Sequence, residues 1–124
     1  MSSVETNPVC SRVATGNVEP LLHEIRHALK RLADGEDGTV IDLKRLPLAP
    51  GEQERIAESL GTGEVRAEVD ALGPTIIQET SYPGVWLITH LNTDGAEVAR
   101  FVEVTDIPEL LRSQQADLDA GIDR

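Results

Sequence analysis

The sequence contains very few aromatic residues and almost no cysteine. Its 124 residues include one Trp, one Tyr, one Phe and one Cys. A hydrophobic core must therefore be built from Leu, Val, Ile and Ala. The lone Cys10 excludes an internal disulfide, and it lies in a polar stretch without an adjacent basic or histidine residue. We favour a thiol without a role over a reactive one at this position.

Basic residues are also scarce, since 11 Lys and Arg stand against 22 Asp and Glu, giving a formal net charge of -11. Binding to phosphate backbones needs clustered cations, so nucleic acid is a poor partner, and an anionic membrane surface is disfavoured for the same reason. The chain has no apolar run long enough to insert into a membrane. It also lacks the apolar segment of a signal peptide. These absences favour a cytoplasmic protein.

The sequence does have enough apolar residues, 40% of the total, for one modest core. Apolar residues recur at three- and four-residue steps over 18–34, which predicts an amphipathic helix. Strict alternation over 64–72 predicts a half-buried antiparallel strand. Turn residues divide the rest into strands at 39–43, 74–82, 85–92 and 96–104, and into short helices at 51–61 and 106–112.

This order of elements predicts the fold class. Helices come first and four consecutive strands follow, which is typical of an α+β fold with a mainly antiparallel sheet of four to five strands. One long helix and one or two short helices should pack on this sheet. The segment 39–43 could lie at an edge, parallel to its neighbour, or beside a central strand. We expect one domain over 18–112, a mobile arm over 1–17 and an acidic, disordered tail over 113–124.

The strand 85–92 is apolar on both of its faces. Val85, Leu87 and Leu91 share one parity, whereas Trp86 and Ile88 share the other. Helices and loops could cover both faces, or one face could bind a partner or a second copy of the chain. For the second reading, the candidate partner-binding residues are Tyr82, Trp86, Ile88, His90 and Phe101. One register of the hairpin places Trp86 opposite Phe101, and a slip changes every pair.

The sequence shows no convincing catalytic or metal-binding constellation. His23 and His27 are spaced i, i+4 on the first helix, which suits two metal ligands, but both lie nearly opposite its apolar stripe. HEIRH at 23–27 has the spacing of the HExxH motif, with Glu24 after the first histidine, but no third ligand is near in sequence. We favour a solvated helix face over a metal site, a structural or interfacial His90 over a catalytic one, and no cofactor.

Several blocks in series resemble the HupH/HyaF family of hydrogenase expression/formation proteins. The quoted blocks are LLHEIRHALKRL, TVIDLKRLPLAPGE, LGTGEVRAEVDALGPTIIQET and YPGVWLITHLNTDGAEVARFVEVTDIPELL. The resemblance runs from about Val18 to Leu111. Its most specific parts are GEV before the alternating strand, the I-x-E-T at 77–80, the GVW at 84–86 and the H-x-N-x-x-G at 90–95.

The resemblance implies a role in assembling membrane-bound [NiFe]-hydrogenase, as a non-enzymatic chaperone or scaffold for the iron–sulfur small subunit before export. Longer family members carry a second, related domain, whereas only one such domain is present here. A homodimer could replace that tandem. The alternative to a chaperone is a protein that handles metal or clusters through His23 and His27.

Overall fold

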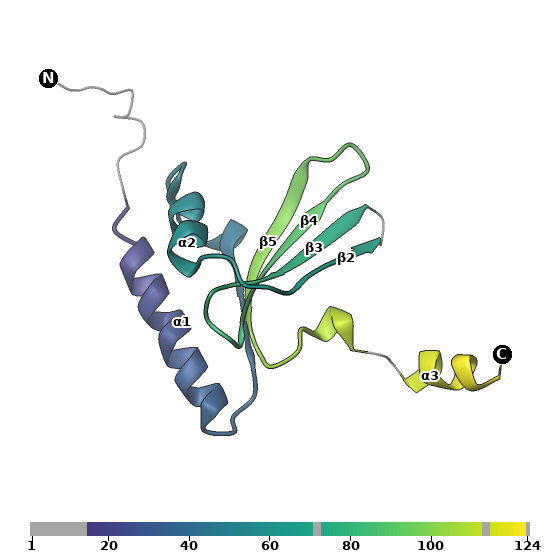
Figure 1. Ribbon diagram of the computed structural model, residues 1–124. Helices are drawn as coiled ribbons and strands as arrows, with labels where there is room; N and C mark the ends of the chain where they lie inside the picture. The colour runs from purple at the N-terminus through teal and green to yellow at the C-terminus, as the bar shows by residue number, and fades with distance from the viewer. Residues whose placement is uncertain (1–14, 71–72, 113–114, 124) are drawn as a thin grey trace, which may run out of the picture.

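The computed structural model describes residues 15–70, 73–112 and 115–123 (Figure 1). In chain order the elements are α1 (Val18–Ala33), β1 (Thr39–Asp42), the 3-10 turn η2 (Leu43–Arg45), α2 (Glu52–Leu60), β2 (Arg66–Asp70), β3 (Pro74–Glu79), β4 (Val85–Leu91), β5 (Glu97–Val104), the 3-10 turn η3 (Glu109–Leu111) and α3 (Gln115–Ile122). The expected strands are all present, although most are shorter than their sequence patterns by one to a few residues.

The five strands form one sheet in the order β1-β5-β4-β3-β2, and every neighbouring pair is antiparallel. This confirms the predicted α+β fold class and places β4 at the centre. β1 lies at an edge, but it runs antiparallel to β5, so a parallel arrangement is wrong. Pairing in this direction sets Ile41 opposite Val102, and both side chains are buried. The edge strand thereby extends the core.

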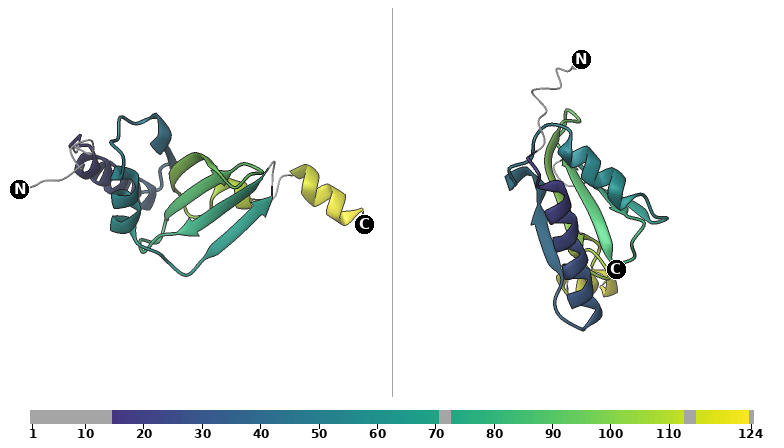
Figure 2. Two further views of the ribbon diagram at one scale, coloured as in Figure 1. Left: turned by 90° about the horizontal axis from the view of Figure 1, so that it is seen from above. Right: turned by 90° about the vertical axis from the view of Figure 1, so that its left-hand side faces the viewer.

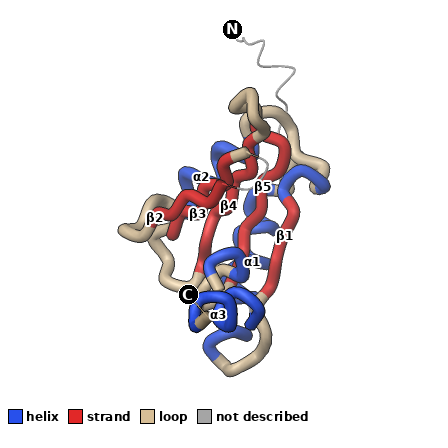
Figure 3. The backbone as a smooth tube through the Cα atoms, turned by 90° about the vertical axis from the view of Figure 1, so that its right-hand side faces the viewer, coloured by secondary structure: helices blue, strands red, loops and turns tan. Residues whose placement is uncertain are grey.

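The helices α1 and α2 lie together on one side of the sheet (Figures 2 and 3). The buried stripe of α1 follows the predicted helical period, and α2 adds Ile56 and Leu60. The sheet contributes Val85, Val102 and Val104 to the same core. Full burial of an aliphatic side chain is worth roughly 1.5–3 kcal/mol, so this aliphatic layer supplies the main stabilisation of the domain despite the lack of aromatics.

A buried carboxylate fixes the start of α2. Glu52 is 2% exposed. Its carboxylate accepts hydrogen bonds from the Ala49 N–H (2.7 Å), the Thr15 hydroxyl (2.7 Å) and the Thr15 N–H (3.0 Å). The Ala49 bond is the largest cause that lowers the pKa of Glu52, followed by the Thr15 hydroxyl, against an opposing effect of burial. These bonds stabilise the charged form of the Glu52 carboxylate. They also connect Thr15, which precedes α1, to the first residue of α2.

Two expectations at the ends of the domain need correction. Within 113–124, which we expected to be disordered, the structure has the helix α3. The helix contains one Gln, two Ala and one Leu, which have good helix propensity, beside two Asp and one Gly, which do not. The short helix expected over 106–112 is reduced to the 3-10 turn η3. Most of the arm over 1–17, including Cys10, lies outside the described residues.

Candidate partner-binding surface

The face of the sheet that points away from α1 and α2 carries the second apolar set of β4. In the observed register, Ile88 lies between Ile77 of β3 and Phe101 of β5. Trp86 lies between Glu79 and Glu103, so the register that would pair Trp86 with Phe101 is wrong. The difference is two residues, which leaves every side chain on its predicted face.

A small apolar cluster forms on this face. Ile77, Trp86 and Ile88 are buried, and the half-buried Ala67, Val69 and Phe101 pack against them. Ala67 and Val69 come from the alternating strand, so its predicted apolar side does face this cluster. The buried members therefore belong to the folded domain itself, whereas its half-buried members form the surface that a partner could contact.

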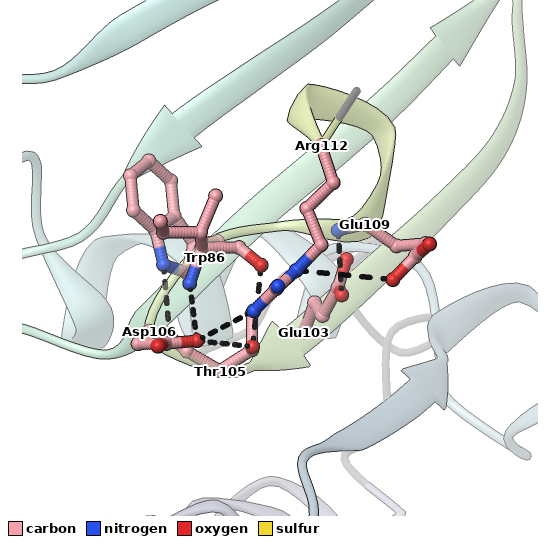
Figure 4. Close-up of polar contacts among 7 residues, drawn as sticks. Trp86, Glu103, Thr105, Asp106, Glu109 and Arg112 are labelled. Carbon is pink, nitrogen blue, oxygen red and sulfur yellow. Dashed lines mark hydrogen bonds and ion pairs between the residues drawn. The ribbon is translucent and has the colours of Figure 1, made fainter. Parts of the chain in front are cut away.

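The chain covers Trp86 with its own residues 105–112, which we name the C-terminal strap (Figure 4). The Trp86 indole Nε1–H donates a hydrogen bond of 3.1 Å to the Thr105 carbonyl oxygen. Pro108 of the strap is fully buried. The indole thus has its single donor satisfied, as buried tryptophans usually do.

Hydrogen bonds to charged side chains hold the C-terminal strap in place. Asp106 Oδ1 accepts hydrogen bonds from the Ile107 N–H (2.8 Å) and from the Arg112 guanidinium (3.1 Å). The hydrogen bond from Ile107 is the largest cause that lowers the pKa of Asp106, and burial opposes it. Glu103 Oε2 of β5 accepts a 3.2 Å bond from the Glu109 N–H. The Asp106 contacts link residues within the strap, and the Glu103 contact links the strap to the sheet (Figure 4).

Further along the same face, His90 lies between a hydroxyl and an aromatic ring. His90 Nδ1 is 2.7 Å from Thr75 Oγ1. Its ring meets Phe101 edge-on, with centroids 5.6 Å apart and an interplanar angle of 81°. Both rings are half-buried, but Thr75 is 3% exposed. The buried hydroxyl of Thr75 therefore holds the imidazole of His90 in a fixed orientation. We name Val69, His90 and Phe101 the sheet-face patch.

Tyr82 does not join this patch. It lies in the turn before β4, is 49% exposed, and borders a groove on the helix side of the sheet. The groove has a volume of about 410 Å³ and is lined by Leu22, Ile25, Arg26, Leu29, Ser59, Leu60, Tyr82 and Val85. We name it the helix groove. One sequence signal indicates this groove, because Leu22 and Leu29 widen the apolar stripe of α1 beyond the residues that are fully buried.

The candidate metal ligands are not brought together with others. His23 and His27 are both exposed on α1. Among the residues that the structure describes, no group of three or more His, Cys, Asp and Glu side chains could hold a metal ion. In the same part of the chain, none of the helices has the length and apolar character to cross a membrane.

Comparison with known proteins gives a consistent result. The family described as "HupH hydrogenase expression protein, C-terminal conserved region" matches residues 15–124. The hydrogenase expression/formation protein HoxQ of Azotobacter vinelandii is 32% identical over 110 residues, which is 87% of this chain and 39% of HoxQ. HupQ of Azotobacter chroococcum mcd 1 is 38% identical over 92 residues, which is 74% of this chain and 32% of HupQ. The chain thus spans about two fifths or less of these relatives.

A solved structure supports the same assignment at the level of the fold. The hydrogenase expression protein HupH from Thiobacillus denitrificans ATCC 25259 superposes with a TM-score of 0.85 and 41% sequence identity, and the match covers 90% of this chain and 92% of that one. The predicted family resemblance is confirmed. This chain belongs to the HupH hydrogenase expression protein family and carries the C-terminal conserved region of that family.

Proposed function

We propose that this chain is an accessory protein of [NiFe]-hydrogenase maturation and that it binds the iron–sulfur small subunit before export. The observation that carries the proposal is the family match over residues 15–124. The curated relatives are named hydrogenase expression/formation proteins, and each is more than twice as long as the segment that it shares with this chain. We further propose that the chain acts by binding its client, without catalysis, and that it does so in the cytoplasm.

The sheet-face patch is the surface that we propose for the client. Val69, His90 and Phe101 are half-buried and lie above the buried Ile88 and Ile77. Aromatic side chains on a rigid sheet are typical of the central residues of protein interfaces. Of the five residues predicted from the sequence, His90 and Phe101 would contact the client directly. Trp86 and Ile88 would support them from below, whereas Tyr82 lies outside this patch.

Co-purification with the hydrogenase small subunit tests the proposal. The tagged chain should retain the small subunit, and parallel samples with and without iron–sulfur clusters would show which form it binds. Phe101→Asp should reduce the amount retained at least tenfold, because it places a charge at the centre of the patch. Val98→Asp is the matched control, since Val98 lies on the same strand, is 57% exposed and is outside the patch.

Thermal melts of both variants are needed, because an unfolded Phe101→Asp protein would also lose the client. If the small subunit is not retained in either cluster state, the proposed client is wrong. If Phe101→Asp and Val98→Asp bind it equally well while folded, the client is retained through another surface.

A further inference from the structure

The helix groove on the opposite side of the sheet is open and apolar. Its wall on α1 consists of the half-buried Leu22 and Leu29, and the half-exposed Tyr82 forms the facing edge. A volume of about 410 Å³ falls within the range of roughly 300–1,000 Å³ that is usual for ligand pockets. Apolar side chains of a second molecule could therefore insert between α1 and the turn before β4.

The charged residue that lines the helix groove, Arg26, is basic, although the chain has a net charge of -11. Arg26 lines the groove, and Lys30 lies one turn further along the same side of α1. Neither forms an ion pair with any residue that the structure describes, in contrast to Lys44, Arg45, Arg100 and Arg112. A groove with this lining suits an occupant that is both apolar and acidic.

The helix α3 has this chemistry. Its two large apolar residues, Leu118 and Ile122, are spaced i, i+4 and are 50% and 80% exposed. The helix contains no basic residue, and acidic residues lie beside both anchors in the sequence, at Asp119 and Asp123. Two apolar side chains one turn apart on a helix can insert into an apolar groove of a partner.

The helix α3 cannot reach the helix groove of its own chain. It projects from the far end of the domain, on the side of the sheet opposite to α1 and α2 (Figures 1 and 3). Only residues 112–114 separate η3 from α3. Three residues span at most roughly 10 Å when extended, so α3 stays close to the end of η3. The occupant must come from another molecule.

We propose that the helix groove binds α3 of a second copy of this chain, with Leu118 and Ile122 as anchors and Arg26 and Lys30 facing the acidic residues. This contact moves the homodimer expected from the sequence away from the sheet face, so it leaves the sheet-face patch free. The proposal does not rest on the proposed function. Since the anchors are few and the charges exposed, the association should be weak and should decrease as salt is added.

Sedimentation velocity of the full chain over a concentration series tests the contact. The unmodified protein should associate, and the double variant Leu118→Ser/Ile122→Ser should associate at least tenfold more weakly. Arg26→Glu should have an effect in the same direction. Arg31→Glu is its matched control, because it makes the same charge change on an exposed part of α1 away from the groove, and it should change the association less than twofold.

A mixing experiment separates this contact from a general loss of solubility or folding. The Leu118→Ser/Ile122→Ser protein keeps an intact groove, whereas the Arg26→Glu protein keeps an intact α3. Mixed together, they should form a heterodimer more strongly than either associates alone. A synthetic peptide of residues 113–124 should compete with this association, and a peptide of the same composition in scrambled order should not.

Two results would overturn the proposal. One is a protein that remains monomeric up to roughly 1 mM, the weak end of specific affinity. The other is an association that Arg26→Glu leaves intact or that the scrambled peptide inhibits equally. All of the substituted side chains are at least half-exposed or on the surface, so melting temperatures close to that of the unmodified protein are expected and must be confirmed.

Discussion

At the scale of single residues, Trp86 links the sheet to the C-terminal strap. Its ring joins Ile77 and Ile88 in the smaller apolar cluster, and its Nε1–H binds the Thr105 carbonyl oxygen at 3.1 Å. The residue is 6% exposed. One side chain therefore covers the sheet and also fixes where the chain leaves β5.

Replacing this side chain should separate its two contributions. Trp86→Ala should lower the free energy of unfolding by roughly 3 kcal/mol or more, as for other large-to-small substitutions of buried aromatics. Trp86→Phe keeps an aromatic ring but leaves the Thr105 carbonyl without its donor, so it should cost less than the alanine variant. Urea unfolding measures both values. Stability that barely changes in Trp86→Ala, with reduced client binding, would instead identify Trp86 as a contact residue.

Glu52 makes stability depend on pH. Hydrogen bonds from Ala49 and Thr15 lower its pKa in the folded state below the ordinary value of 4.5. The stabilisation is therefore fully present above the pKa of the unfolded chain and is lost as pH falls through the lower pKa of the folded state. Glu52→Gln should be less stable than the unmodified protein near neutral pH, and this difference should shrink on acidification through about pH 4.5.

Thermal melts at a series of pH values measure this effect. Glu58→Gln is the matched control, because Glu58 lies on the same helix and is exposed. A constant difference between Glu52→Gln and the unmodified protein over the whole acidic range would show that the Glu52 hydrogen bonds do not depend on its charge.

At the scale of elements, the sequence predicted most of the sheet and the helices on one of its faces, but it did not predict what covers the other face. The alternating pattern of 64–72 identified a half-buried strand, and the apolar residues on both faces of 85–91 identified a central strand. Both patterns could be found because they depend only on the local side-chain period. The antiparallel pairing of β1 with β5 joins residues far apart in the sequence, so no local pattern could reveal it. Tyr82 lies apart from the other four candidate residues, and the sequence could not show this because the direction of a turn side chain has no sequence period.

The cover over Trp86 was missed for a similar reason. The segment DIPELLR resembles a short helix because Asp106 and Pro108 are typical of a helix start. In the structure Asp106 instead accepts hydrogen bonds from Ile107 and Arg112, and Pro108 is buried against the domain. Tertiary contacts outweighed the local preference, as they can over a segment of only a few residues.

The turn before β4 should be more sensitive to substitution than the turn after it. Gly84 and Gly95 have φ values of 92° and 85°, which are unfavourable for a side chain, so changing either to Ala should cost roughly 1–2 kcal/mol. A Cβ at Gly84 would also lie 3.0 Å from Leu29 Cδ1, whereas one at Gly95 would meet no atom within 4 Å. Chemical denaturation should therefore show a larger loss for Gly84→Ala. Equal losses would mean that Leu29 moves aside without cost.

At the scale of the whole molecule, the two sides of the sheet present different surfaces. The helix side has the apolar helix groove, which Arg26 lines, whereas the other side has the half-buried imidazole and phenyl rings of the sheet-face patch. A protein with two distinct surfaces can bind a client and a second copy of itself at the same time. This arrangement needs no bound metal or cofactor.

We expect the purified protein to contain less than one equivalent of zinc, nickel or iron. His23 and His27 are exposed neighbours on α1, and the described residues offer them no third ligand. Two imidazoles on a solvated helix bind metal more weakly than a closed site with four ligands. Elemental analysis after mild purification measures the content, and one full equivalent that is lost in His27→Ala would establish the alternative role in handling metal or clusters.

The pairing of β1 with β5 also has a consequence for the order of events during synthesis. Successive hairpins can build β2 to β5 from local contacts, but β1 and the buried stripe of α1 must wait for the strand Glu97–Val104, on which they pack. Contacts between such distant residues slow folding. On the ribosome, the aliphatic face of α1 should therefore remain unprotected until β5 has emerged, and nascent chains arrested before that point should be the ones that chaperones and proteases recognise.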